Sequence, residues 1–246
     1  MFINQTNSTN DYLKQHPDCD AVWTSWQTAG RGQAGNSWES EQGKNVLFSL
    51  RFRHPHVSVE QQFRLTMAVS LGVQEVVKSL VPQHEVTVKW PNDIYIANRK
   101  VCGILIENTL SDGMITESVV GVGLNVNQTT WLSDAPNPVS LKQLTDIDYD
   151  LPTIYALLCE TIYNKVSLLD QPELLKQQYL SVLFRYGKPA RYACREVSLL
   201  PSRILTVAPD NAFEAVITEV TEQGELMLQT ANGIQSFHFK QIQFIL

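Results

Sequence analysis

Residues 89 to 107 bring a carboxylate, a lysine and a glycine together within nineteen positions. The stretch opens with the string Lys-Trp-Pro-Asn-Asp, which ends at Asp93, and Lys100 follows seven residues later. Asp93 falls where one predicted strand ends and Lys100 where the next begins. One hairpin could therefore hold a metal-binding carboxylate beside an anion-binding cation. Gly103 lies inside the second strand, where glycine often marks close approach of another group to the backbone. A polar turn with a solvated tip is the plainer interpretation of the same residues.

A second candidate is the polar segment 28–45, which is too long for a tight turn. Its glycines include Gly30, Gly32 and Gly35. Long loops inside compact domains are usually functional, and glycines let backbone N–H groups approach a phosphate or carboxylate closely. Arg31 adds a planar, permanently charged fork that suits either anion. Trp38 could stack on a base or close over an apolar ligand. The alternative to an anion-binding loop is a flexible surface loop with one solvated arginine.

The same glycines fit the pattern G-x-G-x-x-G, which raises the alternative of a dinucleotide-dependent oxidoreductase. That pattern requires a strand before it and a helix directly after it, so that the helix N-terminus binds pyrophosphate. The strand is predicted over 21–27, but residues 36–40 run on through another glycine into a strand at Val46. No acidic residue ends a second strand at the expected distance. The context therefore argues against a dehydrogenase.

The elements that must position these residues alternate between short strands and longer helices. Predicted strands cover 21–27, 46–52, 86–90, 93–97, 100–108 and 114–126. Predicted helices begin at Ser8 and cover 58–80, 152–168 and 171–184, with a helical turn near 141–144. Ser8 is the expected N-cap, with Asp11 reaching back to it. The short links between the strands from 86 to 126 favour antiparallel pairing.

The sequence pattern changes after Gly187, because residues 190–246 alternate short β-favouring runs with turn signals. This pattern predicts a small β-barrel or sandwich of about five strands. We therefore expect one domain over 1–187 and a smaller β domain over 188–246. The fold class is α+β, with a mixed, largely antiparallel sheet packed by helices.

Composition limits the classes of protein that this chain can belong to. A hydrophobic content of 43% supports a real core, and a net charge of −6 disfavours non-specific binding to nucleic acid. The four cysteines are scattered without metal-binding spacing, which favours reduced thiols. The N-terminus lacks the features of a signal peptide, and no apolar run reaches membrane-spanning length. We expect a cytoplasmic protein with no membrane partner.

Four motifs, in order along the chain, resemble those of the biotin protein ligases. They are Ser8-Thr9-Asn10, Gln27-Thr28-Ala29-Gly30-Arg31-Gly32 with Gly35 and Trp38, Lys89-Trp90-Pro91-Asn92-Asp93 with Lys100 and the following Gly-Ile-Leu-Ile-Glu, and Gly121-Val122-Gly123-Leu124-Asn125. Each motif alone is weak, but the ordered set is specific. The family often has basic residues where Gln33 and Asn36 stand here, so this loop carries less positive charge than usual.

The resemblance implies a fold like that of class II synthetases and lipoate ligases, with an SH3-like C-terminal barrel. It also implies an activity: biotin and ATP form biotinyl-5'-AMP, and the biotinyl group passes to a lysine of a biotin carboxyl carrier domain. ATP and biotin are then substrates, and Mg²⁺ is the expected cofactor.

Charge considerations assign roles to the candidate residues. A carboxylate and a phosphate about 4 Å apart repel by roughly 4 kcal/mol at an effective dielectric of about 20, so fixed cations are needed between them. Arg31 and Lys100 are the expected catalytic cations, and Asp93 is the expected Mg²⁺ ligand. Expected biotin-binding residues are Ser8, Thr9, Asn10, Gln27, Arg31, Gly32, Gln33, Lys100 and Gly103. Expected ATP-binding or adenylate-binding residues are Gly30, Trp38, Lys89, Asn92, Asp93 and Asn125.

Three rival functions remain open. A lipoate or octanoate protein ligase or transferase shares the fold but lacks this combination of motifs. A biotin-ligating DNA repressor carries a winged helix before the Ser-Thr-Asn motif. Only seven residues precede Ser8, so we expect no DNA binding. A non-catalytic biotin-binding module would not need Lys100 and Asp93. The strands 100–108 and 114–126 could pair with a carrier strand or with a second copy in a homodimer.

Overall fold

A computed structural model describes residues 1–53, 57–133, 136–195 and 212–246. Seven strands form a large sheet in the order β1-β2-β3-β7-β6-β5-β4. Their bounds are β1 (Phe2–Thr6), β2 (Ala21–Gln27), β3 (Val46–Arg53), β4 (Val86–Lys89), β5 (Asp93–Ile96), β6 (Arg99–Ser111) and β7 (Met114–Leu124). β1 runs parallel to β2, and the other five neighbouring pairs are antiparallel. The expected mixed, largely antiparallel sheet is confirmed.

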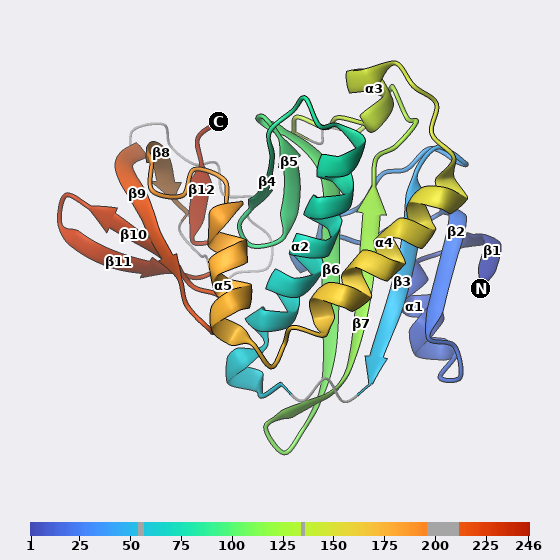
Figure 1. Ribbon diagram of the computed structural model, residues 1–246, viewed down its shortest axis with the longest axis horizontal. Coiled ribbons are helices and arrows are strands. Elements are labelled where there is room, and N and C mark those ends of the chain that lie inside the picture. The colour runs from blue at the N-terminus through green and yellow to red at the C-terminus, as the bar shows by residue number, and fades with distance from the viewer. Residues whose placement is uncertain (54–56, 134–135, 196–211) are drawn as a thin grey trace.

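Alternating side chains give the central strands two different faces. On β7, Val120, Val122 and Leu124 belong to the main apolar core, whereas Gly121 and Gly123 point to the opposite side. The apolar face is covered by α2 (Phe63–Leu80) and α4 (Leu151–Val166), which cross in front of the sheet (Figure 1). The other face carries the short helix α1 (Thr9–Gln15). It also carries the glycines and the polar side chains.

α2 packs against the sheet and against α4, with its buried residues running from Phe63 to Val77. Eleven of its residues are buried, and the backbone of α4 at Ile162 approaches Gly72 so closely that a Cβ there would lie 2.9 Å from the Ile162 Cα. The helix begins at Phe63, so the predicted start at residue 58 is wrong. Ser58 is extended (ψ 159°) and forms a β-bridge with Met114, which leaves only a short 3-10 turn over Val59–Gln61 before the helix.

α1 is fixed over the sheet by Arg51, a buried arginine of β3. Its guanidinium donates to the carbonyls of Leu13, His16 and Cys19, which end the helix and the turn after it. Glu117 on β7 balances the charge at 2.5 Å. These bonds satisfy carbonyls that a helix end leaves open, and they direct the N-terminal end of α1 toward the middle of the sheet.

The predicted capping role of the Ser8 side chain is wrong. Ser8 occupies the N-cap position of α1, but its side chain makes no capping hydrogen bond. Asp11 does not reach back to Ser8, because its carboxylate pairs with Arg31 instead. The Ser8 side chain is therefore not used as a helix cap.

Two further helices and a second, smaller sheet belong to the structure. They are α3 (Leu141–Thr145), α5 (Pro172–Ser181) and the strands β8 (Pro189–Cys194), β9 (Ala212–Val220), β10 (Leu226–Thr230), β11 (Gly233–Phe237) and β12 (Ile242–Phe244). The five strands form a second sheet in the order β11-β10-β9-β8-β12, which fits the expected C-terminal β unit. Figure 1 shows this sheet beside α5 and β4. The domain boundary near residue 187 stays a prediction.

The C-terminal sheet docks on the large one through the β9–β10 turn. Trp90 donates from Nε1 to the Gly224 carbonyl at 2.9 Å, and Arg64 pairs with Glu222 at 2.8 Å. The ring of Phe63 lies directly against Gly224, where a Cβ would come within 2.6 Å of the ring. The tryptophan of the Lys-Trp-Pro-Asn-Asp string is therefore a structural link between the two sheets.

The two segments that could pair with a carrier strand or with a second copy form β6 and β7. β7 is bonded to β3 on one side and to β6 on the other, so the prediction that 114–126 could pair with another chain is wrong. β6 is bonded to β7 along its length but to β5 only over residues 99–102, so the pairing suggested for 100–108 stays a prediction. Within the described residues, no helix combines the length and the apolar character that crossing a bilayer requires.

Candidate active site

A cavity of about 100 Å³ lies on the face of the sheet that carries α1. Its lining includes most of the predicted site residues: Ser8, Thr9, Asn10, Gln27, Arg31, Gly32, Gln33, Trp38, Asn92, Asp93, Lys100 and Gly103. The four motifs, which are spread over residues 8 to 125, therefore converge on one place. Residues that the sequence analysis did not single out as site residues complete the lining: Asn36, Ser37, Ile104, Leu105, Gly121, Val122, Gly123 and Phe239.

The floor of the cavity is a group of three glycines on β6 and β7. Gly103 and Gly123 stand opposite each other in the strand register. The Trp38 ring lies on both, since a Cβ would come within 2.8 Å of it at Gly103 and within 2.6 Å at Gly123. Gly121, one step further along the same face, leaves room for the amide of Asn10. The close approach predicted at Gly103 is thus made by Trp38.

The loop that carries Trp38 is a small hairpin rather than an irregular coil. Trp38 donates from its backbone N–H to Gly30 at 2.8 Å, and Gly32 donates to Asn36 at 2.6 Å. Arg31 and Ser37 form a β-bridge between these two bonds, and a 3-10 turn over Gln33–Gly35 closes the tip. No helix follows the glycines, in agreement with the argument against a dinucleotide-binding motif.

The polar rim is one continuous network at the start of α1. Gln27 accepts from the backbone N–H of Thr9 at 2.8 Å and from its hydroxyl at 3.1 Å. Ser49, which is fully buried on β3, bridges the Thr9 hydroxyl at 2.7 Å and the Asn10 side chain at 2.6 Å. Ser49 was missed, although a lone serine among the apolar residues of a buried strand is a signal that could have drawn attention to it.

Lys100 and Asp93 meet as the hairpin argument predicted. The Lys100 ammonium lies 2.7 Å from the Asp93 carboxylate and 5.5 Å from the centre of the Trp38 ring. In the loop before α3, Asn137 accepts from the backbone N–H of Lys100 at 2.8 Å, and Val139 donates to the Lys100 carbonyl at 2.9 Å. The lysine therefore projects from a rigid strand into the cavity.

Three predicted residues lie outside the cavity lining. Gly30 packs beneath its own hairpin, where a Cβ would come within 2.5 Å of the Trp38 carbonyl oxygen. Lys89 lies between the rings of Tyr95 and Phe244, 5.0 Å from each centre, and burial lowers the pKa of its ammonium. Asn125 donates to Val139 at 3.1 Å, and its side-chain oxygen is buried with no partner among the described residues. Their assignment to ATP stays a prediction.

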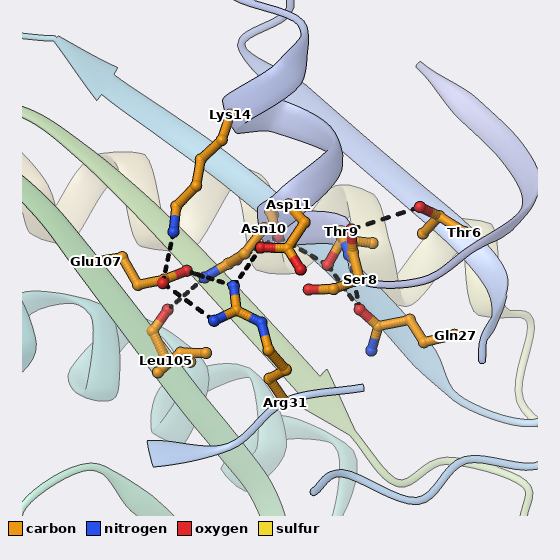
Figure 2. Close-up of polar contacts among 11 residues, drawn as sticks. Thr6, Ser8, Thr9, Asn10, Asp11, Lys14, Gln27, Arg31, Leu105 and Glu107 are labelled. Carbon is orange, nitrogen blue, oxygen red and sulfur yellow. Dashed lines mark hydrogen bonds and ion pairs between the residues drawn. The ribbon is translucent and has the colours of Figure 1, made fainter. Parts of the chain in front are cut away.

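Arg31 reaches from the hairpin to two carboxylates on other elements (Figure 2). It contacts Glu107 of β6 at 3.0 and 3.2 Å and Asp11 of α1 at 2.6 Å. Desolvation alone would lower the pKa of Arg31, but the hydrogen bonds and attraction of the two carboxylates together raise it. Burial alone would raise the pKa of Glu107, but the hydrogen bonds that this carboxylate accepts outweigh burial and lower the pKa.

Phe239 is the contribution of the C-terminal sheet to the cavity. It lies between β11 and β12, is 42% exposed, and packs edge-on against Trp90 with ring centres 6.2 Å apart. Nothing in the sequence pointed to it, because no local pattern connects residue 239 with the motifs between residues 8 and 125.

The residues present set limits on a metal in the cavity. Asp93 is the one acidic side chain in the lining, and no cluster of three or more His, Cys, Asp or Glu suited to a metal occurs within the part of the chain that the structure describes. Such a site fits an ion held mainly by the oxygens of a bound phosphate, as is usual for Mg²⁺. It does not fit an ion held by the protein alone.

Comparisons with known proteins agree with this geometry. The model of the biotin/lipoate A/B protein ligase family matches residues 2–125. The bifunctional ligase/repressor BirA of Escherichia coli strain K12 is 29% identical over 233 residues, which cover 91% of this chain and 67% of that protein. The biotin–[acetyl-CoA-carboxylase] ligase of Mycobacterium tuberculosis is 36% identical over 150 residues, which cover 58% of this chain and 54% of that protein.

A solved structure has the same fold over the whole chain. The biotin protein ligase from Aquifex aeolicus in complex with biotin and ATP superposes with a TM-score of 0.78 and 22% identity, covering all of this chain and 97% of that one. The family model spans every lining residue of the cavity except Phe239, from β1 to the end of β7. The chain belongs to the biotin/lipoate A/B protein ligase family.

Proposed function

We propose that this chain is a biotin–protein ligase, which joins biotin to ATP as biotinyl-5'-AMP and passes the biotinyl group to a lysine of a biotin carboxyl carrier domain. One observation carries the proposal: the polar rim at Thr9 and Gln27, the cation at Lys100 and the arginine-bearing hairpin all border one cavity. The name of the Mycobacterium tuberculosis relative supports ligation of biotin to a protein, and that of the Escherichia coli relative supports a ligase.

The cavity is suited to hold biotin by its two chemically different ends. The ureido ring of biotin offers both hydrogen-bond donors and acceptors, which match the hydroxyl and amide groups of Ser8, Thr9 and Gln27. The apolar part of biotin and the ring of Trp38 would share the floor made by Gly103 and Gly123. The biotin carboxylate would then point along the floor toward Lys100.

The main obstacle to the first reaction is repulsion between two anions, the biotin carboxylate and the α-phosphate of ATP. The biotin carboxylate must attack the α-phosphorus of ATP, and the new C–O–P bond forms as the bond to pyrophosphate breaks. Lys100 stands where both anions meet, and a fixed cation gains value as charge develops in the transition state. Asp93 holds the lysine in place at 2.7 Å. The phosphates and the carboxylate would compete with Asp93 for the same ammonium.

Mg²⁺ is part of this proposal as the ion that accompanies ATP. Asp93 would hold it from the protein side, and the amide oxygen of Asn92 would lie nearby in the lining. When bound, the ion would neutralise phosphate charge. The protein's own part is to supply Asp93 at the edge of the cavity and to keep Lys100 directed into it.

In the second reaction, the ε-amine of the carrier lysine attacks the carbonyl of the biotinyl–AMP anhydride. An amide bond forms, AMP leaves, and the lysine gives up a proton. The name of the Mycobacterium tuberculosis relative supports a carrier domain of a carboxylase as the acceptor. No covalent link to the protein is needed, which agrees with the buried, high-pKa thiol of Cys102.

ATP–pyrophosphate exchange tests the proposal against the lipoate alternative. The purified protein is incubated with Mg-ATP and labelled pyrophosphate, with either biotin or lipoate as the second substrate. We expect exchange that depends on biotin and not on lipoate. Exchange with lipoate alone would assign the chain to the other branch of its family. Exchange with neither would reject acid activation altogether.

A further inference from the structure

Ser49 is a buried serine of β3 that contacts two residues of the Ser8-Thr9-Asn10 motif. It lies opposite Gly121 in the β3–β7 register, on the face of the sheet that carries α1. The Ser49 hydroxyl oxygen is 2.7 Å from the hydroxyl oxygen of Thr9 and 2.6 Å from the amide oxygen of Asn10. Ser49 is fully buried and does not line the cavity, whereas Thr9 and Asn10 do. Its hydroxyl therefore acts on a ligand only through these two neighbours.

The orientation of the Asn10 amide is fixed by its other two partners (Figure 2). Its Nδ2 group donates to the Glu107 carboxylate at 2.8 Å and to the Leu105 carbonyl at 3.3 Å. The opposite orientation would set the amide oxygen against two acceptors, so the oxygen is the atom that faces Ser49. Ser49 is then the donor in that contact, because an amide oxygen has no proton to give.

The contact between Ser49 and Thr9 must therefore use the Thr9 proton, since Ser49 has only one. Thr9 has a second acceptor within reach, the side-chain oxygen of Gln27 at 3.1 Å. That oxygen already accepts from the Thr9 backbone N–H at 2.8 Å. Two hydroxyl oxygens 2.7 Å apart are at the normal distance of a hydrogen bond and repel if no proton lies between them. The hydrogen bonds thus run from Thr9 to Ser49 to Asn10.

The direction of these hydrogen bonds decides what the polar rim offers to a ligand. Thr9 gives its proton to Ser49, so its oxygen offers only lone pairs. Gln27 uses its oxygen on Thr9, and its Nε2 group, which has no partner among the described residues, offers protons. The rim therefore presents an acceptor beside a donor. A cyclic urea carries the complementary pair, an N–H beside a C=O, whereas the dithiolane ring of lipoate carries neither.

We infer that Ser49 is a positioning residue that sets the hydrogen-bond polarity of the rim, so that Thr9 accepts from a ligand N–H and the site selects a cyclic urea. The inference rests on the proposed function for the identity of the ligand. Turning the Thr9 proton toward a ligand oxygen would leave the contact with Ser49 without a proton, which is costly for buried groups. Sites that hydrogen-bond a ligand N–H discriminate strongly against analogues without it.

Calorimetry with matched ligands tests the inference without any turnover. The probes are biotin and its two cyclic carbamate analogues, in each of which one ureido N–H is replaced by an oxygen. The measured quantity is the ratio of the carbamate Kd to the biotin Kd. In the wild type we expect a ratio of about 10² or more for the analogue whose new oxygen meets Thr9. Ser49→Ala releases the Thr9 proton to the ligand, so this ratio should fall by about ten-fold or more.

The matched control is Ser118→Ala on β7. Ser118 is as fully buried as Ser49 and bonds the amide oxygen of Asn108 at 2.7 Å, outside the cavity lining. Its loss should leave the ratio unchanged. Ser49→Thr keeps the hydroxyl and should keep the wild-type ratio. Ser49→Cys, whose thiol is a weak donor, should lower the ratio in part and replaces the alanine variant if that variant unfolds.

The ratio separates the inferred role from a merely structural one, which would weaken all three ligands alike. A wild-type ratio that persists in both Ser49→Ala and Ser49→Cys would overturn the inference, as would wild-type protein that binds biotin and both carbamates equally well. Failure of the wild type to bind biotin would instead reject the proposed function. The isolated rings, imidazolidin-2-one and oxazolidin-2-one, would then be titrated against the Thr9 amide by NMR. A preference for the urea ring that is lost in Ser49→Ala would uphold the inference, and equal binding of the two rings would overturn it.

Discussion

Replacing Lys100 by alanine should remove most of the adenylate-forming activity while the fold survives. The Lys100 side chain is 30% exposed, and its ammonium pairs with Asp93 at 2.7 Å. Partly exposed pairs of this kind stabilise a protein by about 0–1 kcal/mol. The backbone bonds of Lys100 to Asn137 and Val139 do not depend on the side chain. We therefore expect the free energy of unfolding to fall by no more than about 1 kcal/mol.

The loss of activity should be much larger than the loss of stability. Two anions about 4 Å apart repel by roughly 4 kcal/mol at an effective dielectric of about 20. Removing one fixed group that stabilises developing charge typically costs about 10²- to 10³-fold in rate. The guanidinium of Arg31 is already bonded to Glu107 and Asp11, so it is not expected to replace the missing ammonium.

Lys142→Ala is the matched control for this experiment. Lys142 makes an ion pair of the same length, 2.7 Å, with Asp148, and at 28% its side chain is about as exposed as that of Lys100. It does not line the cavity. Biotin-dependent ATP–pyrophosphate exchange and urea unfolding are measured for both variants. Exchange near the wild-type rate in Lys100→Ala, or an equal loss in both variants, would refute the role assigned to Lys100.

Three further perturbations test other parts of the site. Gly123→Ala places a carbon 2.6 Å from the ring of Trp38. Calorimetry should show biotin binding weakened about ten-fold. An unchanged Kd for biotin would argue against the glycine floor. Phe239→Ala should raise the KM for ATP roughly ten-fold. The control is Ile234→Ala, a side chain on the same small sheet that is 61% exposed, and it should leave the KM unchanged. Equal effects of the two substitutions would remove Phe239 from the site. The pKa of Glu107 is lowered on folding, so its ionised form stabilises the protein above the unfolded carboxyl value of about 4.3 and this benefit is lost as the pH falls through the lower folded value. Glu107→Gln should therefore destabilise the protein more at about pH 7 than at about pH 3, and equal destabilisation in urea titrations at both values would contradict the assignment.

Local patterns were sufficient to predict the frame of the large sheet. Short links between strands predicted the antiparallel hairpins from 86 to 126, and the predicted hairpin brings Asp93 beside Lys100 in the structure. The pattern did not reveal β1, because Phe2–Thr6 is a mostly polar edge strand that pairs with β2 across an intervening helix. An edge strand buries little, so its sequence carries little periodicity.

The residues that surround the motifs depend on tertiary contacts and could not be predicted in the same way. Glu107 was recognised only as the end of a strand signature, and its contact with Arg31 joins residues 76 positions apart. Phe239 comes from a different sheet. Lys89 belongs to the Lys-Trp-Pro-Asn-Asp string, and its side chain lies between two aromatic rings outside the cavity lining, a placement that the sequence did not reveal.

Direct transfer of biotin to protein is the most direct test of the central proposal. The chain is incubated with biotin, Mg-ATP and an isolated biotin carboxyl carrier domain, and the intact mass of the carrier is measured with and without ATP. We predict an ATP-dependent gain of one biotinyl group, mapped by peptide sequencing to a single lysine, and its loss with Lys100→Ala. A carrier that stays unmodified beside folded, biotin-binding wild-type protein would contradict the account.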